Sequence, residues 1–136
     1  MEKFLTIPNG VIVSPSFDRG VDLRDDDCRV IVIAKVPFPN RADKQVAARL
    51  YGTGRAGRVW YLVETIRTIC QMTGRGMRSE EDWCRTYILD KAFIKLFNEN
   101  KRLFPKWWAD AIVWDENEPK WVKALANLPT SILASD

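Results

Sequence analysis

The sequence predicts an α/β fold with a parallel sheet of about three strands flanked by helices and a helical, aromatic-rich carboxy-terminal part. The first observation is that short β-branched runs alternate with longer segments whose apolar residues recur every three to four positions. The second is that Val30–Ala34 is continuously apolar, which is typical of a strand covered on both faces in a parallel sheet. The third is the length of 136 residues, which suits one domain.

Three segments are predicted to be strands. Val11–Val13 follows a Pro-Asn-Gly turn, and Val30–Ala34 ends before Pro37 because proline cannot donate to a strand ladder. Arg85–Asp90 is the third. Since sheets usually contain about five or six strands, we expect the remainder to come from a larger domain or from a partner copy, which leaves an oligomer open.

The segments between and after the strands carry a helical pattern. A first helix is expected over Asp43–Tyr51 and a second from Arg58, where an apolar stripe begins. Further helices are expected over Ala92–Phe104, from Trp107 and over Val122–Leu128. Burial against helices or an interface is expected for three aromatic side chains, with base stacking as the alternative: Trp107, Trp108 and Trp114.

Glycines at positions 52, 54 and 57 separate the first two helices. Their spacing matches the G-x-G-x-x-G of dinucleotide-binding turns, which requires a strand before the first glycine. A helix is expected there instead, so we interpret this segment as a flexible connector.

Basic residues are concentrated in the middle of the chain. The whole sequence carries a formal charge of only +3, whereas residues 41–78 contain eight Arg or Lys against two acidic residues, Asp43 and Glu64. Such a basic centre favours contact with a phosphate or polyanion, with a solvated helix face as the alternative.

The cysteine and histidine content excludes several classes of function. Cys28, Cys70 and Cys84 are far apart and form no C-x-x-C pair, so neither a metal site nor a disulfide framework is expected. The chain has no histidine, which excludes a self-contained Ser–His or Cys–His hydrolase. With no signal peptide and no apolar run of about 18 residues, we expect no membrane contact and a cytoplasmic location.

A compact cluster of polar residues follows the second predicted helix: Gln71, Gly74, Arg75 and Arg78. Two guanidiniums three residues apart suit oxygen anions, since each arginine offers five fixed donors and stays charged. An arginine placed in this way stabilises the charge that develops on a γ-phosphate during transfer. The alternative is a basic helix end paired with the acidic residues that follow, Glu80, Glu81 and Asp82.

Two segments together resemble a known family. Ser16–Leu23 resembles motif V of superfamily 2 helicases of the DinG/XPD type, whose pattern runs roughly Ser-Phe-x-Glu-Gly-Val-Asp-Leu. Val30–Pro39 resembles the strand and Pro-Phe-Pro turn that follow it. Gln71–Arg78, followed by Asp82 and a strand ending in Asp90, resembles motif VI. The order and the spacing of these segments both agree with the family.

The resemblance implies that residues 1–95 belong to the second RecA-like domain of an ATP-dependent DNA helicase and that residues 96–136 form a helical extension of it. In such helicases ATP and Mg²⁺ are held mainly by a first RecA-like domain, and the second closes over the nucleotide. Single-stranded DNA and the first RecA-like domain are the implied partners. No iron–sulfur cluster is implied in this chain, because the cysteines of that cluster lie in the first domain.

The resemblance also assigns roles to individual residues of motif VI. Arg75 and Arg78 would contact the γ-phosphate as catalytic residues. Gln71 would sit beside them as a polar sensor, and Gly74 would lie next to the nucleotide.

Motif V would connect the nucleotide to the nucleic acid. Gly20 would let the backbone approach the nucleotide, and Asp22 would reach the ribose or the motif VI arginines. Ser16 and Arg19 would face the nucleic acid. Arg19 stands where the family usually has an acidic residue, which either adds a phosphate donor or marks a degenerate copy.

The sequence contains no GxxxxGK[ST] loop and no acidic metal-binding box, so we expect the chain alone to hydrolyse no ATP. Three hypotheses follow. The chain is a helicase segment that acts with a P-loop domain in cis or in trans, a non-catalytic remnant that binds nucleic acid or a protein, or an oligomer that completes a truncated sheet.

Overall fold

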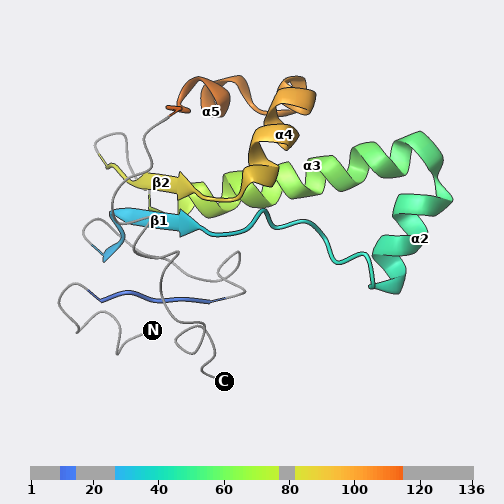
Figure 1. The fold of residues 1–136 in the computed structure, drawn as a ribbon, viewed down its shortest axis with the longest axis horizontal. Coiled ribbons are helices and arrows are strands. Elements are labelled where there is room, and N and C mark those ends of the chain that lie inside the picture. Colours follow the sequence, from blue (N-terminus) through green and yellow to red (C-terminus); the bar gives the residue numbers. More distant parts are fainter. Residues whose placement is uncertain (1–9, 15–26, 77–81, 115–136) are drawn as a thin grey trace.

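The computed structural model describes residues 10–14, 27–76 and 82–114, whose arrangement is shown in Figure 1. Along this part of the chain the elements are β1 (Val30–Ile33), α2 (Lys44–Gly52), α3 (Gly54–Thr73), η2 (Gly74–Gly76), β2 (Arg85–Ile88), α4 (Lys91–Asn100), η3 (Lys101–Leu103) and α5 (Lys106–Asp110), where η marks a short 3-10 helix. The predicted α/β class is confirmed.

The strands β1 and β2 are parallel neighbours, with Val30 opposite Arg85 and Ile33 opposite Ile88. The chain passes from one to the other through α2 and α3, since parallel neighbours require a long crossover. Beyond the paired residues, the Leu89 N–H donates to the Ile33 carbonyl oxygen at 3.0 Å. The two strands therefore enter the sheet at the same edge, which matters for the site described below.

Two expectations about the sheet are wrong. Residues 10–14 form no strand, and Val11 and Val13 are 87% and 79% exposed, so the described sheet has two strands rather than about three. The described residues also do not cover the run Val30–Ile33 on both faces, because Val30 is 56% exposed whereas Ile33 is 1% exposed. Its β-branched residues suit a pleated strand whether one face or both are covered, so the apolar run alone does not report double cover.

The core is formed by the sheet together with α3, α4 and α5. Its buried residues come from β1, the loop after β1, α3 and the aromatic segment (residues 93–108): Ile33, Val36, Ile66, Ile69, Phe93, Leu96, Phe97, Phe104 and Trp108. The indole Nε1 of Trp108 donates to Thr73 Oγ1 at 2.8 Å. This bond ties the aromatic segment to the last residue of α3, so α5 helps to hold the end of that helix in place.

The carboxy-terminal aromatic residues follow the prediction only in part. Trp108 is buried, but Trp107 and Trp114 are exposed, although the Trp114 ring lies 5.6 Å from that of Phe97. The helix α4 ends at Asn100 and not at Phe104 as expected. Phe104 precedes Pro105 and has an extended ψ of 141°, because the residue before a proline disfavours the helical region.

The helix α2 packs against the first turns of α3, at the end of α3 remote from the sheet (Figure 1). The expectation of a flexible connector between them is wrong, since Thr53 is the one residue that separates the two helices. Gly54 has a φ of 57°, which turns the chain where a residue with a side chain would be strained. A Cβ on Gly57 would lie 2.2 Å from the Arg49 carbonyl oxygen, so the helices meet closely.

Aspartates begin two of the helices. Asp43 Oδ1 accepts from the N–H groups of Gln45 and Val46, at 2.8 and 3.0 Å, and starts α2. Asp90 accepts from the Val36 N–H and from the Ala92 N–H, both at 2.9 Å, and these two bonds lower the pKa of its carboxyl. Asp90 thus joins the loop after β1 to the start of α4.

Candidate functional site

The cluster predicted to contact phosphate lies where α3 ends. The Gly74 N–H donates to the carbonyl oxygens of Cys70 and Met72, and the chain then tightens into η2, which carries Arg75. Gln71 and Gly74 are exposed, and Arg75 is half-buried. The structure therefore brings these three predicted site residues together at one helix end, with the arginine on a tight turn of backbone.

The other predicted site residues lie outside the described residues: Ser16, Arg19, Gly20, Asp22 and Arg78. Their roles stay predictions.

Gly76 packs the site onto the sheet. It is buried, and a Cβ added there would lie 2.3 Å from Cys84 Sγ and 2.9 Å from the Cys28 carbonyl oxygen. Cys28 lies two positions before β1, and Cys84 directly precedes β2. A glycine at this position lets η2 approach the entry edge of the sheet, and this contact fixes the backbone next to Arg75.

An ion pair lies at the end of the sheet where both strands begin. Arg29 Nη1 lies 2.5 Å from Asp82 Oδ1, and the side chain of Asp82 is 1% exposed. The same Arg29 nitrogen donates to the Trp83 carbonyl oxygen at 2.8 Å, and the guanidinium lies 5.0 Å from the centre of the Trp83 ring. A partly buried pair of this kind holds the segment after motif VI to the start of β1.

Sequence reasoning missed Arg29. It noted Asp82 as part of the motif VI pattern and, in the alternative interpretation, as a partner for the arginines of that motif. Arg29 and Asp82 are 53 positions apart in the chain, and they meet because their strands are parallel neighbours. The signal available was the position of Arg29 directly before a predicted strand, which becomes informative only once the strand order is known.

The three cysteines of the chain are free thiols with raised pKa values. Burial raises the pKa of Cys84 to about 11, and the neighbouring Cys28 thiol adds to this effect. Burial also raises the pKa of Cys28 and of Cys70. Because the thiolate is the reactive form, these cysteines are poor nucleophiles near neutral pH.

This shift predicts slow alkylation of Cys84. At pH 8 the folded protein should react with iodoacetamide at Cys84 about 100-fold more slowly than the urea-unfolded protein, because two pKa units separate about 11 from the ordinary value of 9.0. Mass spectrometry of the labelled peptides measures the rate. The same shift lowers the free energy of unfolding as pH rises from 9 towards 11, since the unfolded thiol ionises first. Equal alkylation rates in the folded and unfolded protein would show that the pKa of Cys84 is not raised by folding.

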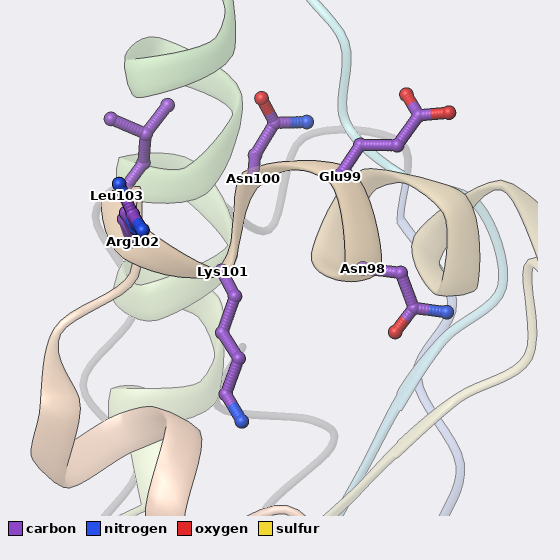
Figure 2. A pocket seen from close by; sticks show the side chains of 6 residues that line it. All are labelled: Asn98, Glu99, Asn100, Lys101, Arg102 and Leu103. Carbon is purple, nitrogen blue, oxygen red and sulfur yellow. The ribbon is translucent and has the colours of Figure 1, made fainter.

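A hollow of about 450 Å³ lies at the end of α4, away from the motif VI cluster. Figure 2 shows the residues that line it, from Asn98 to Leu103, with the side chains of Asn98, Asn100 and Lys101 pointing in different directions. The Asn100 side chain donates to the Leu96 carbonyl oxygen at 3.0 Å. The lining residues present no convergent set of polar groups, so this hollow supplies no second candidate site.

Within the described ranges, no helix is both long and apolar enough to cross a membrane.

Comparison with known proteins decides the family. A sequence model of the helicase C-terminal domain matches residues 6–111 of this chain, which include all the predicted site residues. The chain belongs to the helicase C-terminal domain family. The resemblance to DinG/XPD-type helicases of superfamily 2 is thereby confirmed. The helicase C-terminal domain also runs beyond residue 95 and takes in α4 and α5.

The chain spans only about a tenth of the length of the curated relatives it matches. It is 30% identical over 108 residues to the Fanconi anemia group J protein homolog of Gallus gallus, covering 72% of this chain and 8% of that protein. It is 28% identical over 115 residues to the ATP-dependent DNA helicase CHL1 of Saccharomyces cerevisiae, covering 74% and 13%. The regulator of telomere elongation helicase 1 homolog of Caenorhabditis elegans is 27% identical over 105 residues, covering 68% and 10%. No solved structure matches this chain.

Proposed function

We propose that this chain is the part of an ATP-dependent DNA helicase that closes over ATP held by a P-loop domain and supplies arginines to its γ-phosphate. One observation carries the proposal: in a helicase C-terminal domain, α3 ends at Thr73 and leaves Arg75 on a short turn beside the exposed Gln71. A guanidinium held by such a turn offers fixed donors to phosphate oxygens as charge develops on them.

The surroundings of Arg75 support this role because they fix the backbone on both sides of the turn. Before the turn, Thr73 accepts a hydrogen bond from Trp108. After it, Gly76 is packed against Cys84, and Asp82 is paired with Arg29. An arginine that stabilises a transition state must be held close to its productive geometry before the reaction, since reorganisation during the reaction costs rate.

Motif V completes the proposal. Gly20 and Asp22 would approach the nucleotide, and Ser16 and Arg19 would contact the backbone of single-stranded DNA. Arg78 would join Arg75 on the γ-phosphate. Contacts of Arg19 with the DNA backbone would be independent of base sequence and sensitive to salt.

The P-loop, the magnesium ligands and most of the nucleotide contacts would belong to the first RecA-like domain. The sequence has neither a P-loop nor an acidic metal-binding box. Mg²⁺ would be held by the first RecA-like domain and would offset the negative charge of the phosphates, whereas this chain would contribute only hydrogen-bond donors and close backbone approach. The proposed partners are therefore that first domain, in cis or in trans, and single-stranded DNA.

The test is reconstitution of ATP hydrolysis. The chain is combined with the P-loop domain encoded upstream in the same reading frame or next to it, and phosphate release is measured with and without single-stranded DNA. We expect no hydrolysis by this chain alone, weak hydrolysis by the P-loop domain alone, and DNA-stimulated hydrolysis by the assembled protein. Binding of DNA without any stimulation of hydrolysis would instead support the non-catalytic remnant.

A further inference from the structure

The end of the molecule remote from motif VI forms a strongly basic surface, which we call the basic lobe (residues 38–61). It comprises the loop before α2, α2 itself and the first two turns of α3 (Figure 1). Five exposed cations lie on it: Arg41, Lys44, Arg49, Arg55 and Arg58. Asp43 is the one acidic residue in this range, and its Oδ1 oxygen is already engaged by the start of α2.

No carboxylate among the described residues forms an ion pair with any of these five cations. On α3 beyond the lobe, Glu64 is paired with Arg67 at 2.8 Å. The positive charge of the basic lobe is therefore not neutralised within the described part of the chain. Such a surface attracts anions and raises their local concentration.

The basic lobe also contains a cavity of about 410 Å³ with aromatic walls. Eight residues line it: Phe38, Arg41, Leu50, Tyr51, Gly54, Arg58, Tyr61 and Leu62. Tyr61 holds one wall in place, since its Oη donates to the Pro39 carbonyl oxygen at 3.0 Å and accepts from Arg41 Nε at 3.2 Å. Phe38 stacks on the Tyr61 ring, with centroids 6.0 Å apart and planes at 7°.

The lobe carries two further flat groups, the exposed Tyr51 ring and the exposed Arg49 guanidinium. Tyr51 lines the cavity and is 67% exposed. Arg49 lies over the Trp60 ring, with its Cζ 4.4 Å from the ring centroid. Aromatic rings and guanidinium planes both stack on unpaired bases, and their combination with a positive groove is the usual construction of single-strand binding surfaces.

The basic lobe is separate from the motif VI site. Arg58 lies in the second turn of α3 and Gln71 in its last turn. With a rise of about 1.5 Å per residue, roughly 20 Å of helix separates them. A ligand in the cavity would therefore not compete with a nucleotide at Arg75. A single ligand could reach both the basic lobe and the motif VI site only if it were a nucleic acid several nucleotides long.

We infer that the basic lobe is a second nucleic-acid contact, in which the backbone phosphates of a single strand meet Arg58 and Arg41 and a base stacks on Tyr51. This inference rests on the proposed function for the identity of the ligand, but it places the contact outside motifs V and VI. A duplex fits less well, because its bases are already stacked and present no free face to Tyr51. An acidic protein segment could pair with the arginines of the basic lobe, but its carboxylates would not stack on the exposed Tyr51 ring.

The test is fluorescence anisotropy of a labelled oligothymidylate with the full chain at several salt concentrations. Arg58→Ala should weaken binding about 10-fold and flatten the dependence of log affinity on log salt by about 0.7, the contribution of one phosphate contact in a single strand. Tyr51→Ala should also weaken binding about 10-fold, but with the salt dependence unchanged, because stacking releases no counterions. Both side chains are exposed, so neither substitution removes core packing.

Arg102→Ala is the matched control, since Arg102 is an exposed cation on η3, away from the basic lobe (Figures 1 and 2). It should bind like the wild type. If the wild type binds the oligothymidylate and Arg58→Ala binds equally well, the basic lobe is not the contact. The proposed function is then still tested separately by the reconstituted ATP hydrolysis. If the wild type does not bind at low salt, both this inference and the DNA contacts of the proposed function fail. If polyglutamate competes equally and Tyr51→Ala has no effect, the lobe binds acidic protein, and the inference is overturned.

Discussion

Replacing Arg75 with alanine in the assembled ATPase should lower kcat by ~10³-fold while leaving the affinity for ATP nearly unchanged. The nucleotide would be held mainly by the P-loop domain, so little ground-state binding is lost. The guanidinium would act on charge that appears only during transfer, so its loss falls on the transition state. Arg75→Lys should recover only part of the rate, because a lysine keeps the charge but not the planar fork.

Arg67→Ala is the control for this prediction. Arg67 lies on α3, the helix that leads into the turn carrying Arg75, and it is exposed and paired with Glu64. Its replacement should therefore change kcat little. Steady-state phosphate release with single-stranded DNA in excess measures kcat, and nucleotide titration measures affinity. Should Arg75→Ala keep the wild-type rate while circular dichroism shows a folded chain, the assignment of Arg75 to the γ-phosphate is wrong.

Gly57→Ala should lower the free energy of unfolding by about 1–3 kcal/mol or more. In an exposed helix the same change would usually stabilise by up to about 1 kcal/mol, because alanine is the better helix former. Here the new Cβ would lie 2.2 Å from the Arg49 carbonyl oxygen and 2.6 Å from that of Leu50. Both are backbone atoms of α2, so relief requires the whole helix to move away from α3.

Gly52→Ala supplies the matched comparison with the opposite sign. Gly52 is the last residue of α2, has no positive φ, and a Cβ there would meet nothing within 4 Å. It should raise the free energy of unfolding by a few tenths to about 1 kcal/mol. Urea unfolding followed by tryptophan fluorescence measures both variants. Equal stability of the two variants would mean that α2 and α3 do not meet as closely as the structure shows.

The local pattern of the chain was sufficient for several elements. The helical period of the apolar residues located α2 and α4 to within a few residues at their starts, and the short apolar runs located β1 and β2. The position of Arg75 beside Gln71, at a helix end punctuated by glycine, also followed from adjacent residues. These features depend on interactions between residues a few positions apart, which a sequence displays directly.

Other features were decided by contacts between distant segments. The glycines at 54 and 57 signalled a break, but only the packing of α2 on α3 shows that the break is a tight corner and not a flexible connector. Val30 looked like a doubly covered strand residue, yet its face stays open among the described elements. Likewise, Arg29 gave no signal until β1 and β2 were known to be neighbours.

The family, the helix and strand types and the cationic cluster at the end of α3 could all be predicted, because each depends on residues close together along the chain. The folded molecule was needed to show three further features: the pairing of Asp82 with Arg29, the packing of Gly76 against Cys84, and the cavity shared by Phe38, Tyr51 and Arg58. These contacts join segments up to 53 positions apart, and the period of the apolar residues carries no information about which distant segments will pack together.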